Sequence, residues 1–545
     1  MIDANSRAIT WAGRHRHFLL LALSILFSAF LRLPYFQYDF IFIDEACWAN
    51  GANVLHQGGQ LYVDLALDKN PPIFWFCAAL FRIFGVNMTV IHAGALLLVC
   101  TTSLLLFLMG ARFFSKDVGA AAALVHAFAS TTYYIPRIIG MNTETLMVFF
   151  STAAALTYLF GLSQKNRFCF FFAGLLASFA FLTKPVAGTE MAALALFLFA
   201  GNDRSLKTKL ASALVLVSGF TLGLVLFLGY LHHAGILFAW WDQAIVYGFR
   251  YVGRISIGAF LSKSFRVAAA FACIFAWLFI LIGYSRKLRD ENARAYAFLV
   301  CWLAASFAGV VVGRRYYANY FIQVMPPLSL LGGIGLTYLW NNRHHHNLRL
   351  IARVCCAAFL VSFLWFHFRT IVNWCALVYP PMHNIKLWDM WQETVRNREI
   401  AGYIRSHSSQ DDKIFLWGAK SQLLFLAQRR TPDQWQDYEV ADDYPPRSAE
   451  PETRLRTAES LRKTKPIFIV DAERAARIEG YPELRRLIEE LYTFESEISG
   501  VRLYRLREVK SMGKDSLRQE TRESVFFSPP TQLTGMAGVI ARVKN

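Results

Sequence analysis

The chain has 545 residues, of which 55% are hydrophobic, 15% aromatic and only 17% charged, whereas a soluble domain usually carries about 25% charged residues. This composition excludes a disordered chain. The formal net charge of +18 is uneven, because residues 1–375 hold 29 basic and 13 acidic side chains and residues 376–545 hold 27 and 25. The basic side chains of the first part lie in short clusters between long apolar runs, which is typical of a membrane protein and not of a nucleic-acid-binding protein.

Apolar runs close to the ~20 residues that cross a bilayer recur along this first part. We interpret eleven of them as transmembrane helices, at residues 18–36, 88–111, 118–136, 145–163, 168–183, 186–201, 209–231, 266–284, 296–313, 318–340 and 350–372. The first run follows a basic cluster, as in a signal peptide, but it is longer and no small-residue cleavage site follows it, so we interpret it as a retained anchor. The two runs beside Lys184-Pro185 allow an alternative, one long re-entrant hairpin.

The distribution of basic residues predicts the orientation of the chain in the cell inner (plasma) membrane. With a cytoplasmic N-terminus, seventeen of the 29 basic residues of the first part face the cytoplasm, as the positive-inside rule requires. An odd number of spans then places the residues after Cys375 on the external, periplasmic side. All nine cysteines lie in the first part, and their spacing indicates neither a disulfide framework nor a zinc site.

The composition divides the chain into three parts. Residues 1–373 are expected to form a transmembrane catalytic domain whose first external loop is 37–87. Residues 374–510 are expected to form a soluble external α/β domain, because a helical pattern at 391–406 precedes two short strand patterns at 413–418 and 466–471. A surface loop is expected at 433–446, and 511–545 is expected to be a loosely ordered tail. The predicted fold class is a polytopic α-helical membrane protein with a C-terminal α/β domain.

Five of the thirteen carboxylates of the first part lie in the first external loop, namely Asp39, Asp44, Glu45, Asp64 and Asp68. Ionisable groups near a membrane are costly and usually functional, so this concentration favours an enzyme that works at the membrane face. The loop is long and aromatic, and Pro71-Pro72 is typical of the start of a helix that lies on the membrane surface.

Three motifs of this loop are specific: the pair Asp44-Glu45, a Gly-x-x-Tyr-x-Asp stretch that ends at Asp64, and Asp68-Lys69-Asn70-Pro71-Pro72, with Phe84-Gly85 closing the loop. They resemble the first external loop of polyprenyl-phosphate-dependent glycosyltransferases of the GT-C class. The branch is the one that holds dolichyl-phosphate-mannose protein mannosyltransferases and the lipid A aminoarabinose transferase. Weaker similarities follow at 142–146, 181–185, 315–321 with Pro326-Pro327, and 417–418. The resemblance thus spans roughly residues 18–480, although Asn319 stands where many members have histidine.

The resemblance implies a GT-C fold and an integral membrane glycosyltransferase, either a hexosyl- or a pentosyltransferase. Such an enzyme moves a sugar from a polyprenyl-phosphate donor, such as an undecaprenyl phosphate sugar, to a lipid, glycan or protein acceptor on the external face. Its partners are the donor, the acceptor and membrane lipids, and no nucleic acid is expected. The sequence leaves open which sugar and which acceptor take part, and the oligomeric state.

The reaction needs a base on the attacking hydroxyl and cations on the departing phosphate. By resemblance, Asp44 is the expected base, Glu45 is expected to orient Asp44 or the acceptor, and Lys69 is expected to hold the donor phosphate. Further candidates for the phosphate are Arg250, Arg254, Arg314, Arg315, Tyr317 and Tyr320, and candidates for the sugar or acceptor are Glu144, Asp64 and Asp68. A single displacement predicts inversion at the anomeric carbon. No cofactor is expected, because a monophosphate leaving group needs less charge neutralisation than a diphosphate, although a carboxylate pair does not exclude a divalent metal.

Each candidate residue also has a structural alternative. Asp44-Glu45 suits the cap of a surface helix, Lys69 suits a side chain that reaches the lipid headgroups, and Glu144 suits a charge at a helix N-terminus. Tyr317 and Tyr320 suit an interfacial aromatic belt. For the whole protein, the alternatives are a transporter or flippase of a lipid-linked substrate and a non-catalytic lipid-binding protein. The sequence shows no internal repeat of the kind that many transporters carry.

Overall fold

The computed structural model describes residues 2–132, 138–200, 204–249, 257–384, 389–418, 420–432, 451–472 and 477–507. Met1–Leu506 forms one compact unit, and Arg507–Asn545 is a second unit. The expected surface loop at 433–446 and the expected tail at 511–545 lie outside the described residues, as do Arg250 and Arg254.

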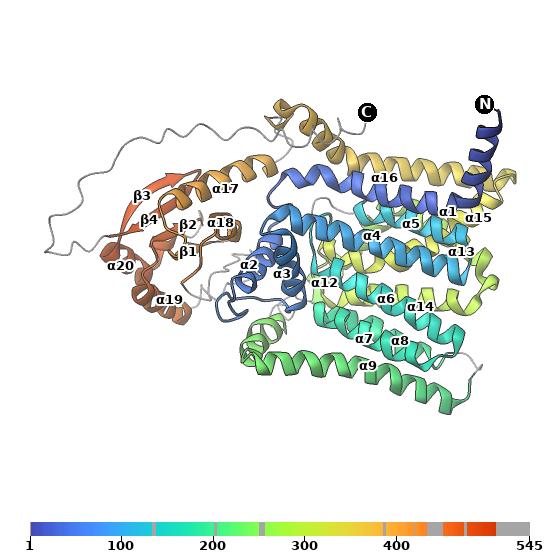
Figure 1. The fold of residues 1–545 in the computed structure, drawn as a ribbon, viewed down its shortest axis with the longest axis horizontal. Coiled ribbons are helices and arrows are strands. Elements are labelled where there is room, and N and C mark those ends of the chain that lie inside the picture. Colours follow the sequence, from blue (N-terminus) through green and yellow to red (C-terminus); the bar gives the residue numbers. More distant parts are fainter. Residues whose placement is uncertain are drawn as a thin grey trace. The chain divides into compact units, whose positions relative to one another are not determined.

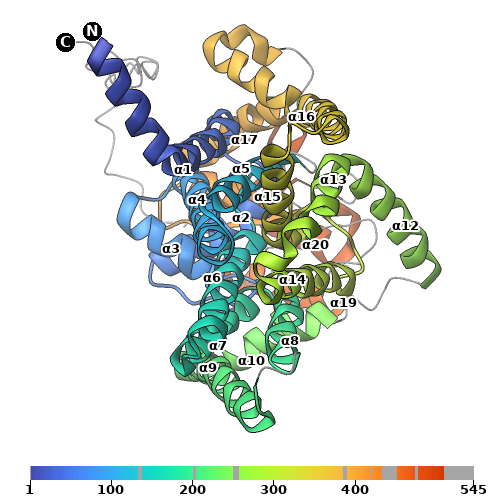
Figure 2. The same cartoon turned by 90° about the vertical axis from the view of Figure 1, so that its right-hand side faces the viewer.

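The first part of the chain is helical (Figure 1), and Figure 2 looks along many of its helices. Its α-helices are α1 (Ile2–Arg32), α2 (Asp44–His56), α3 (Pro72–Phe84), α4 (Met88–Phe113), α5 (Lys116–Thr132), α6 (Thr143–Gln164), α7 (Arg167–Thr183), α8 (Gly188–Phe197), α9 (Leu206–His233), α10 (Leu237–Trp240), α12 (Ile257–Ile274), α13 (Ala276–Ser285), α14 (Ala293–Val312), α15 (Met325–Asn341) and α16 (His346–Val378). Helix α3 begins at Pro72, as the Pro71-Pro72 pair predicted.

Within the described residues, each of the eleven predicted spans falls on helical segments; residues 133–136 and 201 lie outside the described ranges. In the described ranges, seven helices are long and apolar enough to cross a membrane, or eight when a bent pair is taken as one span. The polytopic helical membrane fold predicted from the apolar runs is therefore confirmed. Helices α5, α7 and α8 have 17, 17 and 10 residues, which is shorter than the ~20 residues of an ordinary span, so the full count of eleven stays a prediction.

One predicted span is bent, and a second break lies between two predicted spans. The span at 266–284 is bent by 77° where α12 meets α13, and the joint at Phe275 is buried in protein, where a membrane protein tolerates irregular backbone. The second break follows Lys184. There the short 3₁₀ helix η2 (Pro185–Ala187) separates α7 from α8, because Pro185 has no N–H group with which to continue the helix.

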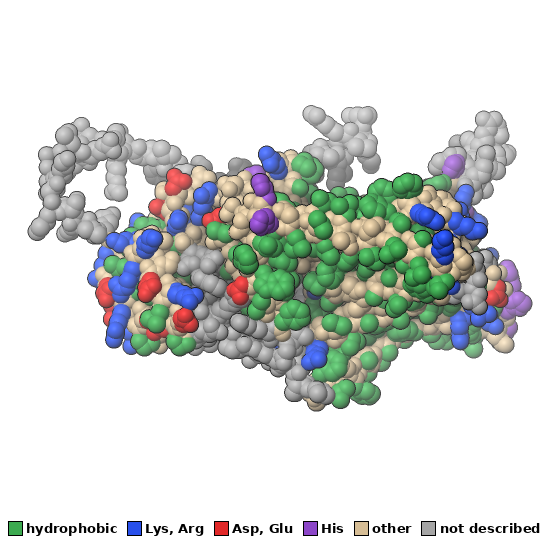
Figure 3. All heavy atoms as spheres, turned by 90° about the horizontal axis from the view of Figure 1, so that it is seen from below, with side chains coloured by type: hydrophobic (Ala, Val, Ile, Leu, Met, Phe, Trp, Pro, Cys, Tyr) green, Lys and Arg blue, Asp and Glu red, His purple; other side chains and the backbone are tan. Residues whose placement is uncertain are grey.

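The outer surface of the helical part suits contact with lipid. Apolar side chains cover its middle, whereas charged side chains gather at one end of it and on the C-terminal part (Figure 3). Leu23, Leu226 and Trp365 are examples of large apolar side chains that are exposed on the long helices. Exposed apolar surface of this extent marks a membrane contact and not a soluble monomer.

The C-terminal part contains a mixed sheet with helices around it, which confirms the α/β pattern. In the described residues the strands are β1 (Ile414–Trp417), β2 (Phe468–Asp471), β3 (Tyr492–Ile498) and β4 (Val501–Leu506), in the order β1-β2-β4-β3. Strands β1 and β2 are parallel, and β4 is antiparallel to both of its neighbours. The helices are α17 (Asp389–Ser406), α18 (Ser421–Ala427), α19 (Pro451–Thr464) and α20 (Pro482–Leu491).

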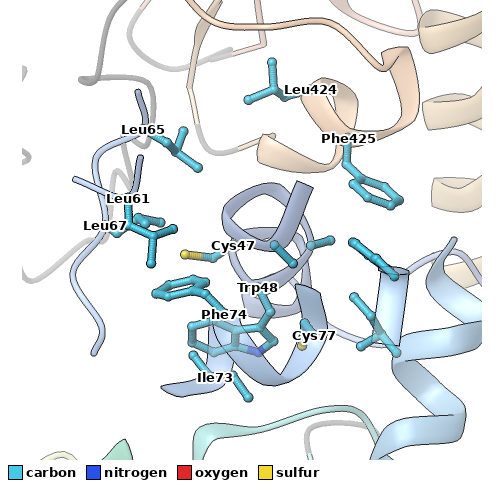
Figure 4. Close-up of a cluster of buried hydrophobic side chains, with 14 of the residues drawn as sticks. Cys47, Trp48, Leu61, Leu65, Leu67, Ile73, Phe74, Cys77, Leu424 and Phe425 are labelled. Carbon is cyan, nitrogen blue, oxygen red and sulfur yellow. The ribbon is translucent and has the colours of Figure 1, made fainter. Parts of the chain in front are cut away.

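The first loop and the C-terminal part share one hydrophobic cluster. Figure 4 shows side chains of α2, α3 and α18 directed into it, among them Trp48, Phe74 and Phe425. Polar contacts reinforce this packing, since Asn50 Nδ2 donates to the backbone oxygen of Ser421 at 2.9 Å. The first-loop helices and the C-terminal sheet therefore lie on the same side of the membrane helices.

Candidate active site

Glu144 is a buried carboxylate in the first turn of α6, with a side chain that is 1% exposed. Its Oε2 accepts a hydrogen bond from Thr143 Oγ1 at 2.9 Å. Its Oε1 accepts one from Asn319 Nδ2 at 2.9 Å and forms an ion pair with Lys184 Nζ. A buried carboxylate is tolerated when it is both paired and hydrogen-bonded. Glu144 therefore joins α6 to the end of α7 and to the 3₁₀ helix η5 (Ala318–Val324).

Lys184 is a charged residue of this cluster to which the sequence assigned no role. Its backbone is extended, with φ −151° and ψ 119°, as expected for a residue that precedes proline. This conformation ends α7 and places Lys184 beside η5. There its Nζ lies 4.1 Å from the centroid of the Tyr320 ring, a cation–π contact, while it also pairs with Glu144.

Several predicted site residues lie within electrostatic range of the hydroxyl group of Tyr320. The charges of Glu144, Lys69 and Asp44 all act on this hydroxyl group, and so does Tyr317. The rings of Tyr317 and Tyr320 are arranged edge to face with their centroids 5.7 Å apart. The fold thus brings the predicted base, the predicted phosphate cation and a predicted sugar contact into one electrostatic neighbourhood.

Asp44 and Glu45 are neighbours at the start of α2, but their surroundings differ. Asp44 is half-buried and belongs to the neighbourhood just described. Glu45 is fully buried. Its Oε2 accepts from Ile41 N at 2.7 Å and lies 3.2 Å from His92 Nε2, and its Oε1 accepts from Met141 N at 2.8 Å. Because both oxygens of Glu45 are engaged by protein, the geometry favours its orienting role over contact with an acceptor.

Glu45 also connects the start of α2 with the residues that lead into α6. The backbone N–H of Met141 donates to Glu45, and Met141 lies three residues before the buried Glu144. Gly140 permits the close approach, because a Cβ atom at that position would lie 2.4 Å from Glu45 Oε1. One carboxylate therefore sets the spacing between the helix that begins with Asp44 and the helix that begins beside Glu144.

Lys69 lies in a loop that other residues hold in place. Its Nζ is paired with Asp68, but its side chain is still 38% exposed, so a ligand can reach it. The hydroxyl group of Tyr62 donates to the backbone oxygen of Lys69 at 2.6 Å. Burial and the nearby Asp68 carboxylate hold the pKa of Tyr62 well above its usual range, so this hydroxyl group remains a donor at any ordinary pH.

The other two candidate carboxylates of the loop make contacts within it. Asp64 is exposed, and its Oδ2 accepts from Gln60 N at 2.7 Å, which closes a turn. Asp68 pairs with Lys69. These contacts account for both side chains as parts of the loop, and a contact of either with the sugar or acceptor stays a prediction.

The arginines of the 314–315 stretch differ in exposure. Arg314 is exposed and Arg315 is buried. Arg314 and Tyr316 both have a left-handed backbone, with φ 52° and 53°, and such strained residues cluster at functional sites. The Tyr316 hydroxyl group lies 2.7 Å from Ser264 Oγ of α12, which ties the stretch to that helix. A role of either arginine in binding phosphate stays a prediction.

Glu190 is a buried carboxylate to which the sequence analysis gave no weight. It lies in α8, and its Oε1 accepts from Ser306 Oγ at 2.6 Å. Ser151, Gln323 and Trp302 are within interaction range of the same carboxyl group. Gln323 belongs to η5, the element that also carries Asn319. Glu190 therefore helps to hold the element that contributes Asn319 to the candidate site. The sequence did contain a signal for this residue, because Glu190 is an acidic residue inside an apolar run and such residues are usually functional.

Among the described residues, no group of three or more His, Cys, Asp or Glu side chains is arranged to hold a metal ion. The expectation of a reaction without a metal stays a prediction.

Two comparisons of sequence bear on this arrangement. Residues 68–233 match the model of the family described as dolichyl-phosphate-mannose-protein mannosyltransferase. This match begins at Asp68-Lys69 and includes Glu144 and Lys184. An uncharacterised protein of Aquifex aeolicus (strain VF5) is 25% identical over 191 residues, which are 34% of this chain and 37% of that protein. The chain thus spans well under half the length of that relative.

The fold also has solved counterparts. The crystal structure of ArnT from Cupriavidus metallidurans in the apo state superposes with a TM-score of 0.56 at 14% identity, covering 90% of this chain and 98% of ArnT. The structure of the same protein bound to undecaprenyl phosphate gives 0.55 at 14% identity, covering 89% and 97%. The resemblance to the GT-C class that the sequence indicated is therefore confirmed, by the family match over 68–233 and by a fold shared with ArnT.

Proposed function

We propose that the protein is a membrane glycosyltransferase that moves a sugar from a polyprenyl phosphate to a hydroxyl-bearing acceptor on the external face. The observation that carries the proposal is that one loop holds both a half-buried carboxylate, Asp44, and a reachable cation, Lys69, each within electrostatic range of Tyr320. A displacement at a sugar carbon with a phosphate leaving group needs these two groups. The family match over 68–233 and the binding of undecaprenyl phosphate by ArnT support the same donor class.

The reaction is a single displacement. The acceptor oxygen attacks the anomeric carbon, the bond from that carbon to the phosphate oxygen breaks, and the configuration inverts. Asp44 takes the proton of the attacking hydroxyl group, which raises the nucleophilicity of its oxygen. Lys69 stabilises the charge that gathers on the departing polyprenyl phosphate.

Glu144 and Lys184 act at the sugar. Glu144 is buried and Lys184 is 18% exposed in this ion pair, and Asn319 Nδ2 donates to the same Glu144 oxygen. The pair is thus a preorganised polar group that does not need to rearrange in the transition state. Asn319 takes the place where many members of the class have histidine. A neutral amide cannot gain a proton, so we propose that its role is to hold Glu144.

The location follows from the same contacts. The first loop and the C-terminal sheet lie together, and the distribution of basic residues predicts that this side faces away from the cytoplasm. We therefore propose that the site faces the periplasm of the inner membrane, where both an acceptor and a lipid-linked donor can reach it.

The test is the release of polyprenyl phosphate from a donor labelled in its sugar, with the purified protein in proteoliposomes and a cell-envelope extract as the source of acceptor. Label that appears in a new product, together with equimolar polyprenyl phosphate, supports a transferase. Label that crosses the bilayer on the intact donor supports a flippase instead, and binding without either change supports a lipid-binding protein. Mass spectrometry of surface glycolipids and glycoproteins, with and without this protein, then identifies the sugar and the acceptor.

A further inference from the structure

The segment 237–249 follows helix α9 in the chain and packs against the loop 61–70. It consists of α10 (Leu237–Trp240), a π-helix over Trp241–Val246 and a further helical turn to Phe249. Helix α9 ends at His233 after 28 residues and is apolar enough to cross a membrane. The chain then turns at Gly235, where φ is 72°. Only a short turn therefore separates the segment from a candidate membrane span.

One side of the segment exposes large aromatic side chains. Phe238 is 85% exposed, Trp241 53% and Phe249 77%. Tyr230, near the end of α9, is exposed as well. Aromatic side chains that are exposed next to the end of a membrane helix are typical of the belt that anchors proteins at the level of the lipid headgroups.

The other side of the segment holds the loop that carries Lys69. Trp240 is buried, and its Nε1 donates to Asn70 Oδ1 at 3.0 Å. Gln243 is also buried; its Nε2 donates to the backbone oxygen of Tyr62 at 2.9 Å. Its Oε1 accepts the backbone N–H of Leu67 at 3.0 Å. Three hydrogen bonds thus fix both ends of the stretch from Tyr62 to Asn70.

We propose that the segment 237–249 docks on the bilayer surface through its exposed aromatic side chains, and that Trp240 and Gln243 thereby hold the Lys69 loop at the depth of the lipid headgroups. The partner is the lipid surface itself. A polyprenyl phosphate carries its phosphate at that depth, because its chain is apolar and its phosphate is charged. The role of Lys69 rests on the proposed function, whereas the docking and the bracing of the loop do not.

The docking is tested by photocrosslinking. A photoreactive phenylalanine analogue is placed at Phe238 or Phe249 in the full chain, which is reconstituted in vesicles of phosphatidylethanolamine and phosphatidylglycerol. Phe494 is the matched control, because it is 58% exposed on β3 of the C-terminal sheet. Lipid adducts are expected at 238 and 249 and not at 494. Adducts with protein alone at 238 and 249, or equal lipid adducts at all three positions, would overturn the docking.

The bracing is tested with Gln243→Ala, which removes two of the three hydrogen bonds. Each such bond is worth about 1 kcal/mol, so amide hydrogen exchange in the peptide 61–70 is expected to become about five- to thirtyfold faster. Gln164→Ala, at an exposed glutamine at the end of α6, is expected to leave exchange in that peptide unchanged. Gln243→Glu keeps the acceptor for Leu67 N–H and is expected to restore part of the protection. Unchanged exchange in Gln243→Ala would overturn the bracing.

Steady-state kinetics test whether the braced loop serves donor binding. Gln243→Ala is expected to raise KM for the polyprenyl-phosphate donor about tenfold with little change in kcat, because it loosens a binding loop and leaves Asp44 in place. If exchange is faster but KM is unchanged, the loop is braced without serving the donor. If the unmodified protein releases no polyprenyl phosphate, the proposed function fails, and the crosslinking and exchange results still decide the docking and the bracing.

Discussion

Glu45 Oε1 accepts the backbone N–H of Met141 at 2.8 Å, which links two segments that lie far apart in the sequence. Because Asp44 precedes Glu45 and Glu144 follows Met141 closely, this contact helps to position the predicted base relative to the predicted sugar contact. A catalytic geometry that depends on one buried carboxylate is sensitive to that carboxylate even when it touches no substrate.

Asp44→Asn is expected to lower turnover by about 10²–10⁴, because the amide keeps the size of the side chain but cannot accept a proton. Donor binding and thermal stability are expected to remain, since Asp44 is half-buried and contributes little to packing. The measurement is the rate of polyprenyl phosphate release at saturating donor. Near-normal turnover in this variant would show that the base lies elsewhere, and Glu144 would be the next residue to test.

Glu45→Gln is expected to cost less turnover than Asp44→Asn and more stability. The Glu45 carboxylate has three partners, Ile41 N–H, Met141 N–H and His92, and an amide offers them only one oxygen. One of the two backbone N–H groups then faces an NH₂ group, and a buried unsatisfied donor costs about 1–3 kcal/mol. Thermal unfolding and turnover are measured on the same preparations. If Glu45→Gln abolishes turnover at full stability while Asp44→Asn does not, the roles of the two residues must be exchanged.

Lys69→Ala is expected to raise KM for the donor about ten- to a hundredfold, because a charge-assisted hydrogen bond to phosphate is worth roughly 1.5–3 kcal/mol. The thermal stability is expected to change little, since the ion pair with Asp68 is partly exposed and such pairs contribute about 0–1 kcal/mol. Lys207→Ala, at an exposed position at the start of α9, is the matched control. An unchanged KM would assign Lys69 to contact with lipid headgroups.

Lys184→Ala is expected to destabilise the fold by about 3–5 kcal/mol, because it leaves the carboxylate of Glu144 buried without its cation. The double variant Glu144→Gln with Lys184→Ala is expected to recover much of that loss, since the charge is then removed from both sides. Unfolding midpoints of the single and double variants give the coupling. Additive losses would mean that the pair contributes no coupling energy.

A reporter that is active only in the cytoplasm is expected to stay silent when it is fused after Asn545. The reason is the distribution of basic residues, together with the contact between the first loop and the C-terminal sheet. The same reporter fused after Asn342, in the basic loop before α16, is expected to be active. An active reporter after Asn545 would contradict the odd number of spans.

The sequence by itself determined the helical membrane part. Apolar runs and basic clusters are local properties, and a bilayer sorts each run by its own length and charge, so the described parts of all eleven predicted spans fall on helical segments. The first-loop motifs indicated the GT-C class for a similar reason, since they lie within about thirty residues. Strands β1 and β2 appeared as apolar runs because both faces of the sheet are covered. The hairpin of β3 and β4 did not, because charged residues such as Glu495 and Glu497 interrupt its apolar pattern.

Only the tertiary structure decided which charges meet. Lys184 and Asn319 lie 40 and 175 residues from Glu144 in the sequence, and no periodicity records that pairing. Glu45 and Asp44 are adjacent, yet Glu45 is buried against Met141 and His92, whereas Asp44, the first residue of α2, is only half-buried. The hydrogen bonds of Gln243 to the Lys69 loop are equally invisible in the sequence. A contact between distant residues depends on how helices pack against one another, whereas hydropathy reports only how each helix meets its solvent.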